Sequence, residues 1–484
     1  MSEQAIIFTG VAIYIAIMAG VAVYASKRTH TATEFVLAGR SLSLGLCTAT
    51  IVATWFGGGM LMGGSGAAYD DGLLGVIADP FGATLCLLLT GLFFVRIFRR
   101  LKFFSFIEFV EQRFGRIATI VTSAASLMSN IFWVAGMLVA FGIIFESLTS
   151  TPLVIGIIGG AFVVIAYTSI GGMLAVALTD FVQVIIIAAG LVLLFVVVLY
   201  DAGGWSSVYA QIPETAWRMI PLEHTGERWL NYLRAWFIFG LADLASQSLL
   251  QRAMAAKNER VAQNSFYLAG FGYLAFAMIP VTLGIIASVT MPGLADSESV
   301  LPTLAIEHLH PVAVAIFVGA LLAAIMSSCD SSLLAAATVI STNILPFFKK
   351  NPADTTSLAV ARWSIPICGI IAVIGALNAQ VVFNTMIDAN MLMLAAVIMP
   401  FILGVYWKKA NRTGALAAMA AGIAAWIVSS SFYPDLPGDL IGLGASLAVM
   451  LIATPLSQKF DPPRTLVDRD GNPVELTNRL GILR

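Results

Sequence analysis

The sequence predicts an all-α polytopic membrane protein with about thirteen transmembrane helices. Of its 484 residues, 59% are hydrophobic and only 11% are charged, and the mean hydropathy is +0.91. A water-soluble domain of this size cannot bury so much apolar surface. Apolar runs of ~20 residues, the length that crosses a bilayer as a helix, recur along the whole chain. They are centred near Ile15, Ile51, Leu88, Met128, Phe162, Ile187, Leu241, Leu274, Gly319, Ile370, Leu394, Ala421 and Ala445.

The basic residues predict the orientation, because Lys and Arg in short loops stay on the cytoplasmic side. Most of them fall in alternate loops, from Lys27 after the first span to the residues from Lys459 onward. No positive charge precedes the first span, so we interpret it as a retained anchor and not as a signal peptide. We expect a multi-pass protein of the plasma (inner) membrane, with its N-terminus outside and its C-terminus cytoplasmic. The basic residues left on or near the outer side are Arg218, Arg228 and Arg234.

Composition and motifs argue against several other classes of protein. The net charge of −1 offers no basic patch, so no nucleic-acid partner is expected. The four cysteines stand in apolar spans at unrelated spacings, which is typical of small buried residues. No lysine follows a glycine, so the chain lacks a phosphate-binding loop for ATP. It also lacks the H-E-x-x-H and G-x-S-x-G motifs, and we expect no enzyme.

The second apolar run contains an unusual glycine-rich stretch, ATWFGGGMLMGGSGAAY, from Ala53 to Tyr69. Glycine weakens a helix and lets the backbone approach a ligand closely. Backbone groups freed at membrane depth cost several kcal/mol unless something satisfies them. An interrupted helix in this position therefore indicates a cavity, a bound ion or a bound solute, as in a transporter.

The run AAIMSSCDSSLL, from Ala323 to Leu334, places five oxygen-bearing side chains within about two helical turns. Ser327, Asp330 and Ser331 share one face, and Ser328 contributes to an adjoining stripe. The serines alone could equally serve packing between helices. A carboxylate at this depth, however, marks a functional site, and we expect Asp180 to be its partner. Two acids and several hydroxyls suit sodium, although proton coupling stays an alternative.

Three further acids, Asp79, Asp243 and Asp388, stand within predicted spans. Asp79 or Asp243 could contact a cationic group of a substrate or pair with a buried Gln or Tyr, and the sequence favours neither role for Asp388. Trp55 and Trp133 lie near the expected cavity, and indole faces attract quaternary ammonium ions. A passive channel or sensor is the alternative class, but a pore needs a continuous polar lining, whereas these acids are scattered singly.

These residues resemble the sodium/solute symporter family over nearly the whole chain. The shared motifs are the broken helix, the GGM…TD…Q pattern around Asp180, SQSLLQRAMAAKN from Ser246, and AAIMSSCDSS. The chain is most similar to the high-affinity choline transporter subfamily, which shares ATW-x-GGG followed by AxY, a Trp at position 133 and an SS-x-DSS run.

The resemblance implies a single transporter domain over residues 1–484 with a LeuT-type fold of two inverted five-helix repeats. Such repeats carry broken helices that meet at mid-membrane. An N-terminal anchor helix and loop would cover 1–41, and two additional helices 407–456. The remaining expected parts are the first repeat, 42–201, an external loop, 202–228, the second repeat, 229–406, and a cytoplasmic tail, 457–484.

The resemblance also implies where sodium and a small-molecule substrate bind. The sodium ligands would be Ala53, Phe56, Ala324, Ser327 and Ser328. Support for that site, or a second sodium site, would come from Asp180, Asp330 and Ser331. The solute would lie against Trp55, Gly57, Gly58, Tyr69, Trp133, Asp243, Ser246 and Gln247.

The choline-type aromatic cage is matched only in part, because Ser246 stands where a third cage Trp is expected. Asp243 could compensate by offering a negative charge to an amine. We therefore expect a sodium-coupled importer of a small organic solute. That solute is an amine or quaternary ammonium compound such as choline, or else a zwitterionic or neutral solute such as proline, betaine, a sugar, a monocarboxylate or a vitamin.

Overall fold

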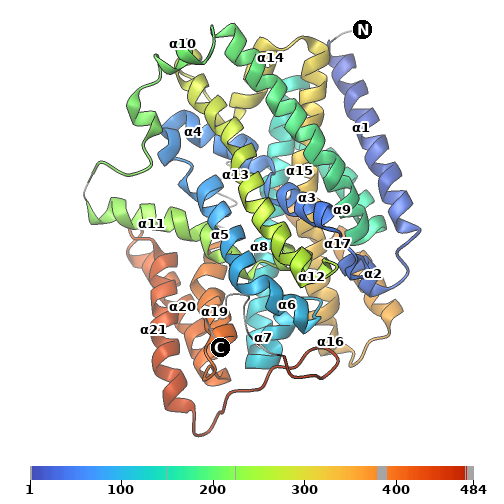
Figure 1. Ribbon diagram of the computed structural model, residues 1–484, viewed down its shortest axis with the longest axis vertical. Helices are drawn as coiled ribbons and strands as arrows, with labels where there is room; N and C mark the ends of the chain where they lie inside the picture. Colours follow the sequence, from blue (N-terminus) through green and yellow to red (C-terminus); the bar gives the residue numbers. More distant parts are fainter. Residues whose placement is uncertain (1–2, 150, 224, 379–389, 475, 477–484) are drawn as a thin grey trace.

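The computed structural model describes residues 3–149, 151–223, 225–378, 390–474 and 476. These residues form helices and short connecting loops, and the β-bridges among them are isolated pairs. The helices run mostly along the long axis of the molecule (Figure 1). An all-helical membrane fold is therefore confirmed.

Nine helical stretches among the described residues are long and apolar enough to cross a membrane, and a bent pair raises the number to ten. The nine are Thr9–Ser26 of α1, Ile77–Leu101, Arg116–Glu146 of α8, Leu153–Asp201, Glu259–Thr290, Pro311–Phe348, Asp354–Ala376, Arg412–Phe432 and Gly438–Ser457. This number is smaller than the thirteen expected, although each predicted centre lies in a helix or at a helix break.

Three predicted spans are not separate long helices, and they account for the difference between the ten helical spans observed among the described residues and the thirteen expected. The helix α9, Leu153–Asp201, has 49 residues and would be about 70 Å long if straight, more than twice the bilayer core. It is broken at Gly172, whose φ of 62° only glycine adopts readily. It therefore represents two predicted spans. The other two cases are the interrupted pair α11 and α12, described next, and the short apolar segment Asn390–Tyr406.

Each expected repeat begins with a broken helix. In the first, α3, Leu44–Trp55, is bent by 56° from the segment Gly59–Leu74. In the second, α11, Gly226–Gly240, is separated from α12, Gln247–Ala255, by a short 3-10 turn. Both breaks lie in the middle of the molecule (Figure 1). Mid-membrane breaks of this kind are where transporters of inverted-repeat type bind ions and solutes.

Basic residues gather at one end of the molecule (Figure 1). The helices at this end are α2, Ala32–Leu37, α6, Val95–Leu101, α7, Phe106–Phe114, and α16, Leu345–Phe348. Arg40 donates to the carbonyl oxygens of Met254 and Phe103, each at 3.2 Å, and Arg99 donates to that of Ala256 at 2.7 Å. The α1 helix, Glu3–Ser26, starts at the opposite end. The alternation of basic loops predicted from the sequence is thus reproduced in space, and the cytoplasmic assignment of the basic end stays a prediction.

Candidate functional site

Two serines of α15, Pro311–Val339, contact the broken end of α3. The Ser327 hydroxyl donates to the carbonyl oxygen of Ala53 at 2.8 Å and lies 2.9 Å from that of Ala324. The Ser328 hydroxyl donates to the carbonyl oxygen of Thr54 at 2.8 Å. All these side chains are buried. Four of the five predicted sodium ligands are therefore together at the junction of the two helices.

The helix break makes these carbonyl oxygens available. In an unbroken helix the Ala53 carbonyl would accept from the N–H of Gly57, four residues later. Instead the Gly57 N–H donates to Trp55 at 2.9 Å, because Phe56 leaves the helix with a ψ of 67°. The carbonyls of the last helical turn then need other partners. The two serines supply hydroxyls that are themselves able to coordinate a cation.

Gly57 and Gly58 allow the break to approach its neighbours. A Cβ at Gly57 would lie 2.2 Å from the Ser328 hydroxyl oxygen, and one at Gly58 would lie 2.7 Å from the Ala140 methyl group. Any side chain there would push α15 or α8 away. The two predicted solute-binding glycines thus act through close packing in this structure.

A second polar cluster lies directly beside these serines. The Thr50 hydroxyl donates to the Asp180 carboxylate, and Arg252 lies 4.0 Å from that carboxylate with both side chains fully buried. The Arg252 guanidinium also donates to the carbonyl oxygen of Thr50 at 3.2 Å and to the Ser331 hydroxyl. One carboxylate oxygen of Asp180, Oδ1, is buried and has no hydrogen bond.

Asp330 completes this cluster on the side of α9. The Tyr167 hydroxyl donates to its carboxylate at 2.7 Å, and the Ser331 hydroxyl donates to its other oxygen at 3.2 Å. Ser331 also lies 3.1 Å from the Thr54 hydroxyl, which connects the cluster to the helix break. The expected proximity of Asp180, Asp330 and Ser331 is therefore observed.

Two carboxylates and one guanidinium leave room for one more positive charge. Buried charges are tolerated only when they are paired and hydrogen-bonded. Arg252 supplies one partner, and the unpaired oxygen of Asp180 is a free ligand for a monovalent cation. The residues present therefore fit sodium. The Arg252 side chain is fully buried among these polar groups, a position that the sequence does not predict because Arg252 stands only five residues before Lys257.

A small cavity of about 30 Å³ lies beside the break of α3. Its lining brings together Trp55, Trp133, Asp243 and Ser246, four of the eight residues predicted to contact the solute. The remaining lining residues are polar: Thr54, Ser129, Asn130, Ser248, Ser332 and Asn390. A cavity this small has space for about one or two water molecules and is too small for an organic solute in this conformation. We call it the closed cavity for this reason.

Asp243 is oriented by a chain of hydrogen bonds that crosses the cavity wall. The amide nitrogen of Asn390 donates to Asp243 Oδ2 at 3.1 Å, and the Ser129 hydroxyl lies 3.1 Å from the amide oxygen of Asn390. Asp79 has a different surrounding, since it is buried and accepts a hydrogen bond from the Tyr273 hydroxyl. Asp243 therefore faces the cavity, Asp79 pairs with a tyrosine, and Asp388 lies outside the described residues.

Two predicted solute contacts lie elsewhere. Tyr69 follows Trp55 by 14 positions, so it lies away from the cavity. Its hydroxyl donates to the carbonyl oxygen of Met291 at 2.9 Å. Gln247 faces away from the cavity, since neighbouring residues on a helix point in different directions. Its side chain accepts from the N–H of Phe106 at 3.1 Å and donates to the carbonyl oxygen of Phe104 at 3.2 Å.

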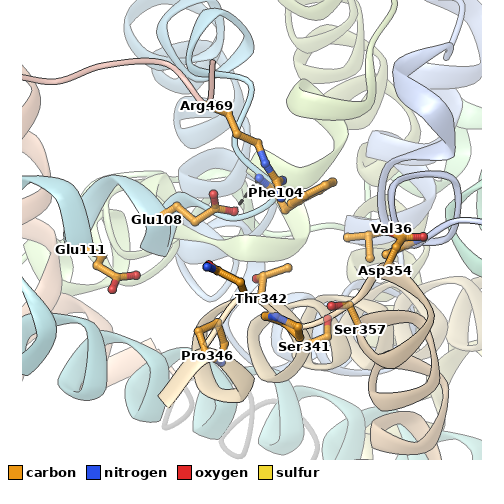
Figure 2. Close-up of a pocket in the computed structure, with 13 residues that line it drawn as sticks. Val36, Phe104, Glu108, Glu111, Ser341, Thr342, Pro346, Asp354, Ser357 and Arg469 are labelled. Carbon is orange, nitrogen blue, oxygen red and sulfur yellow. Dashed lines mark hydrogen bonds between the residues drawn. The ribbon is translucent and has the colours of Figure 1, made fainter. Parts of the chain in front are cut away.

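A larger cavity of about 450 Å³ opens at the basic end of the molecule (Figure 2). Ser341 and Thr342 stand on one side of it, and Glu108 of α7, Phe106–Phe114, stands on the other. Burial raises the pKa of Glu108. Between the two cavities, Gln251 donates to the Thr338 hydroxyl at 3.0 Å. We describe the larger cavity as the inner vestibule.

The C-terminal segment 464–474 runs along one edge of the inner vestibule, where it contributes Arg469 to the lining, and we call it the strap (Figure 2). Its Arg469 lies over the ring of Phe104, 3.7 Å from the centroid (Figure 2). Lys102 forms ion pairs with Asp468, at 3.2 Å, and with Asp470. On the other side, Arg113 donates to the carbonyl oxygen of Arg464. The strap therefore contacts the chain on both sides of the turn that joins α6, Val95–Leu101, to α7.

Two broken membrane helices, a closed polar cavity between them and a junction of carbonyl and hydroxyl oxygens beside it are the features of a secondary transporter. The chain belongs to the sodium:solute symporter family, whose model matches residues 35–422. The predicted family is thus confirmed, as is the expectation of a transporter in place of an enzyme.

Two relatives illustrate the range of solutes that similar proteins carry. The chain is 29% identical to high-affinity choline transporter 1 of Drosophila melanogaster, over 81% of this chain and 65% of that protein. It is 27% identical to the osmoregulated proline transporter OpuE of Bacillus subtilis, over 93% of this chain and 95% of that protein.

A solved structure supports the same fold. A Na⁺-coupled sialic acid symporter in its substrate-bound outward-open state matches with a TM-score of 0.82 and 22% identity. The match covers 96% of this chain and 99% of that one. The LeuT-type architecture predicted from the sequence is confirmed.

Proposed function

We propose that this protein is a symporter that uses sodium to import a small organic solute by alternating access. The observation that carries the proposal is the junction of α3 and α15, where Ser327 and Ser328 reach the carbonyl oxygens freed by the helix break. Hydroxyl and carbonyl oxygens are the ligands that hard monovalent cations prefer. Sodium bound there would hold the break in the shape that forms the solute cavity.

The proposed sodium site uses the carbonyl oxygens of Ala53, Phe56 and Ala324 and the hydroxyls of Ser327 and Ser328. When sodium leaves, the links between α3 and α15 at the break would be the hydrogen bonds of Ser327, Ser328 and Ser331, and the helices could separate. The neighbouring cluster of Asp180, Asp330 and Ser331 would support this site or take a second sodium. Its single unpaired carboxylate oxygen supports the second role.

The energy available per sodium is sufficient for concentrative uptake. One positive charge crossing 100 mV supplies ~2.3 kcal/mol. A tenfold sodium gradient adds ~1.4 kcal/mol. Together they allow a neutral solute to accumulate by roughly several hundredfold per sodium ion. In the membrane we place the basic end, with the inner vestibule and the strap, on the cytoplasmic side.

The proposed solute site is the closed cavity at Trp55, Trp133, Asp243 and Ser246. Its carboxylate and two indoles favour a cationic solute such as an amine or a quaternary ammonium compound. A zwitterionic or neutral solute, as carried by the proline transporter relative, is the competing possibility.

A two-stage experiment tests the proposal. Purified protein is first screened by thermal shift against choline, betaine, proline, sugars, monocarboxylates and vitamins, each in sodium and in potassium, because a ligand of the folded state raises its stability. The stabilising solute is then offered to proteoliposomes with and without an inward sodium gradient. A symporter accumulates the solute above its outside concentration only with the gradient. Equal uptake under both conditions would indicate a channel.

A further inference from the structure

We infer that the solute of this transporter is a protonated amine that donates N–H hydrogen bonds, and not a quaternary ammonium ion. The inference rests on the proposed function and narrows it to one substrate class. It comes from the geometry of the closed cavity, where a carboxylate and hydroxyl oxygens occupy the side on which an aromatic cage would need a third ring.

Asp243 is the charged residue among the described residues that line the cavity. Asn390 donates to its Oδ2 at 3.1 Å and is itself fixed by Ser129. These two hydrogen bonds fix the plane of the Asp243 carboxylate and involve one of its two oxygens. The other oxygen, Oδ1, is then the natural acceptor for a cationic donor that enters the cavity.

Hydroxyl groups surround the same side of the cavity. The Ser246 and Ser248 hydroxyls lie 2.9 Å apart and share one hydrogen bond, and Ser332 adds a third hydroxyl. Asn130 uses its amide nitrogen on the carbonyl oxygen of Ser126, at 2.7 Å, which leaves its amide oxygen as a further acceptor. An ammonium group with N–H bonds can satisfy several of these oxygens at once.

A quaternary ammonium ion presents methyl groups to every side and has no N–H bond. It would bind to the two indoles but would donate no hydrogen bond to the second oxygen of Asp243 or to the serine oxygens, and polar groups that are buried without such a donor are costly. Trp55 and Trp133 each make a T-shaped contact with another ring, Tyr273 at 6.2 Å and Phe239 at 6.1 Å. These contacts favour the present orientation of both indoles.

The cavity also disfavours solutes with a carboxylate. None of the described residues that line it is Lys, Arg or His. The carboxylate of such a solute would have to lie beside Asp243, and the two negative charges would repel each other. Proline, betaine and monocarboxylates are therefore expected to bind more weakly than an amine of similar size.

A methylation series tests the inference. Ethanolamine, N-methylethanolamine, N,N-dimethylethanolamine and choline carry the same positive charge and hydroxyl but have three, two, one and no N–H bonds. Affinity is measured for the purified protein in sodium by calorimetry. We expect it to fall along the series, by about tenfold or more between ethanolamine and choline, since a hydrogen bond to a charged group is lost.

An isomer pair controls for size. The compounds 1-amino-2-propanol and N-methylethanolamine contain the same atoms, but the first keeps three N–H bonds. Tighter binding of 1-amino-2-propanol would support the inference. Equal affinity of the two isomers, or an affinity that rises toward choline, would overturn it.

Two variants connect the series to the named residues. Asp243→Asn should flatten the preference for N–H bonds, and Ser246→Trp, which supplies the third ring, should shift it toward choline. Sodium-dependent thermal stabilisation without solute confirms that each variant is folded. If no amine binds but another solute accumulates in a sodium gradient, the amine inference fails and the proposed symport stands. If no solute accumulates with sodium, the proposed function itself fails.

Discussion

Ser327 and Ser328 join two helices that lie far apart in the sequence, and each does so through one hydrogen bond to a carbonyl oxygen of the helix break. A hydroxyl that donates to a carbonyl in this conformation keeps its lone pairs for a cation. The same atoms can therefore hold the junction together and bind sodium, so changing one serine should alter sodium dependence more than folding.

The Ser328→Ala substitution tests this role. It removes one proposed ligand but fills the same space, so we expect normal expression and a sodium concentration for half-maximal uptake that rises about tenfold, the loss of a cation ligand being worth ~1.4 kcal/mol or more. Sodium activation of uptake is the measurement. Ser364→Ala on α17, Asp354–Ala376, is a matched control, because Ser364 is buried and its hydroxyl donates to the carbonyl oxygen of Val360 in the same helix. Unchanged sodium activation in Ser328→Ala would argue against the assigned site.

Arg252 allows a second prediction at the scale of single residues. Arg252→Gln leaves the buried Asp180 without its guanidinium partner and removes the hydrogen bond from Arg252 to the Ser331 hydroxyl. Breaking a buried ion pair costs ~3–5 kcal/mol, so we expect a large drop in thermal stability measured in potassium. Adding Asp180→Asn to the same chain should recover much of that loss. If the double variant is no more stable than Arg252→Gln, the two charges are not coupled.

Spacing along the chain could predict the residues that carry oxygen on one helix face. Ser327, Asp330 and Ser331 come together as the helical period requires, and Asp180 was recognised as a lone acid in an apolar span. Arg252 and Asn390 were missed for a physical reason. Their roles depend on how α12 and the last helix of the second repeat pack against α3 and α8. The spacing of residues within one segment does not predict that packing. An arginine only five positions before Lys257 looks like the end of a span.

At the scale of elements, the break in α9 shows how a glycine can reverse a membrane chain. Gly172 contacts Phe35 of α2, Ala32–Leu37, at the basic end, whereas Asp201 pairs with His308 at 2.8 Å at the other end. The chain thus crosses the bilayer twice within α9, with the turn at Gly172. The sequence could predict both apolar runs but not that no loop separates them.

Gly172→Ala should destabilise the protein. The new Cβ would lie 2.6 Å from the carbonyl oxygen of Phe35, and the backbone would keep an unfavourable positive φ. We expect a loss of about 2 kcal/mol or more, seen as a lower unfolding temperature in detergent. Gly159→Ala, also in α9, is the matched control because no atom lies within 4 Å of its added Cβ. Similar unfolding temperatures for the two variants would contradict the proposed turn.

The strap gives a prediction about salt and pH. Hydrogen bonds from the Asn472 backbone and from Lys102 lower the pKa of Asp468, and ion pairing with Asp470 and Asp468 raises the pKa of Lys102. The Asp468 contribution to docking is present above its ordinary pKa of 3.8 and is lost as pH falls through the lowered value. The Lys102 contribution is present below its ordinary pKa of 10.5 and is lost as pH rises through the raised value.

Protection of the strap from protease should therefore be constant between pH 3.8 and pH 10.5, the ordinary pKa values of the two groups. It should decrease as salt is added, because salt screens exposed ion pairs. Lys102→Ala should remove the salt dependence, and the rate of cleavage within the strap is the measurement. Arg100→Ala, which removes a different ion pair, to Glu259, is the control. A cleavage rate that is independent of salt in the unmodified protein would show that the ion pairs do not hold the strap.

At the scale of the whole molecule, the two broken helices and the scaffold helices around them form one mechanical unit. Residues of α3, α8, α12 and α15 line the proposed solute cavity, and the proposed sodium site lies where α3 meets α15. Any movement that separates α3 from α15 would therefore disturb both proposed sites together. Binding of sodium and binding of solute would be coupled through this shared boundary, and such coupling acts equally in both directions.

The most direct test of this account is the simultaneous measurement of sodium flux and solute flux in proteoliposomes, for the unmodified protein and for the double variant Ser327→Ala, Ser328→Ala. We predict a fixed ratio of sodium to solute in the unmodified protein, with accumulation of the solute against its gradient. In the double variant we predict loss of accumulation while the solute still exchanges. A fixed ratio that survives in the double variant would contradict the claim that sodium binds at the junction of α3 and α15.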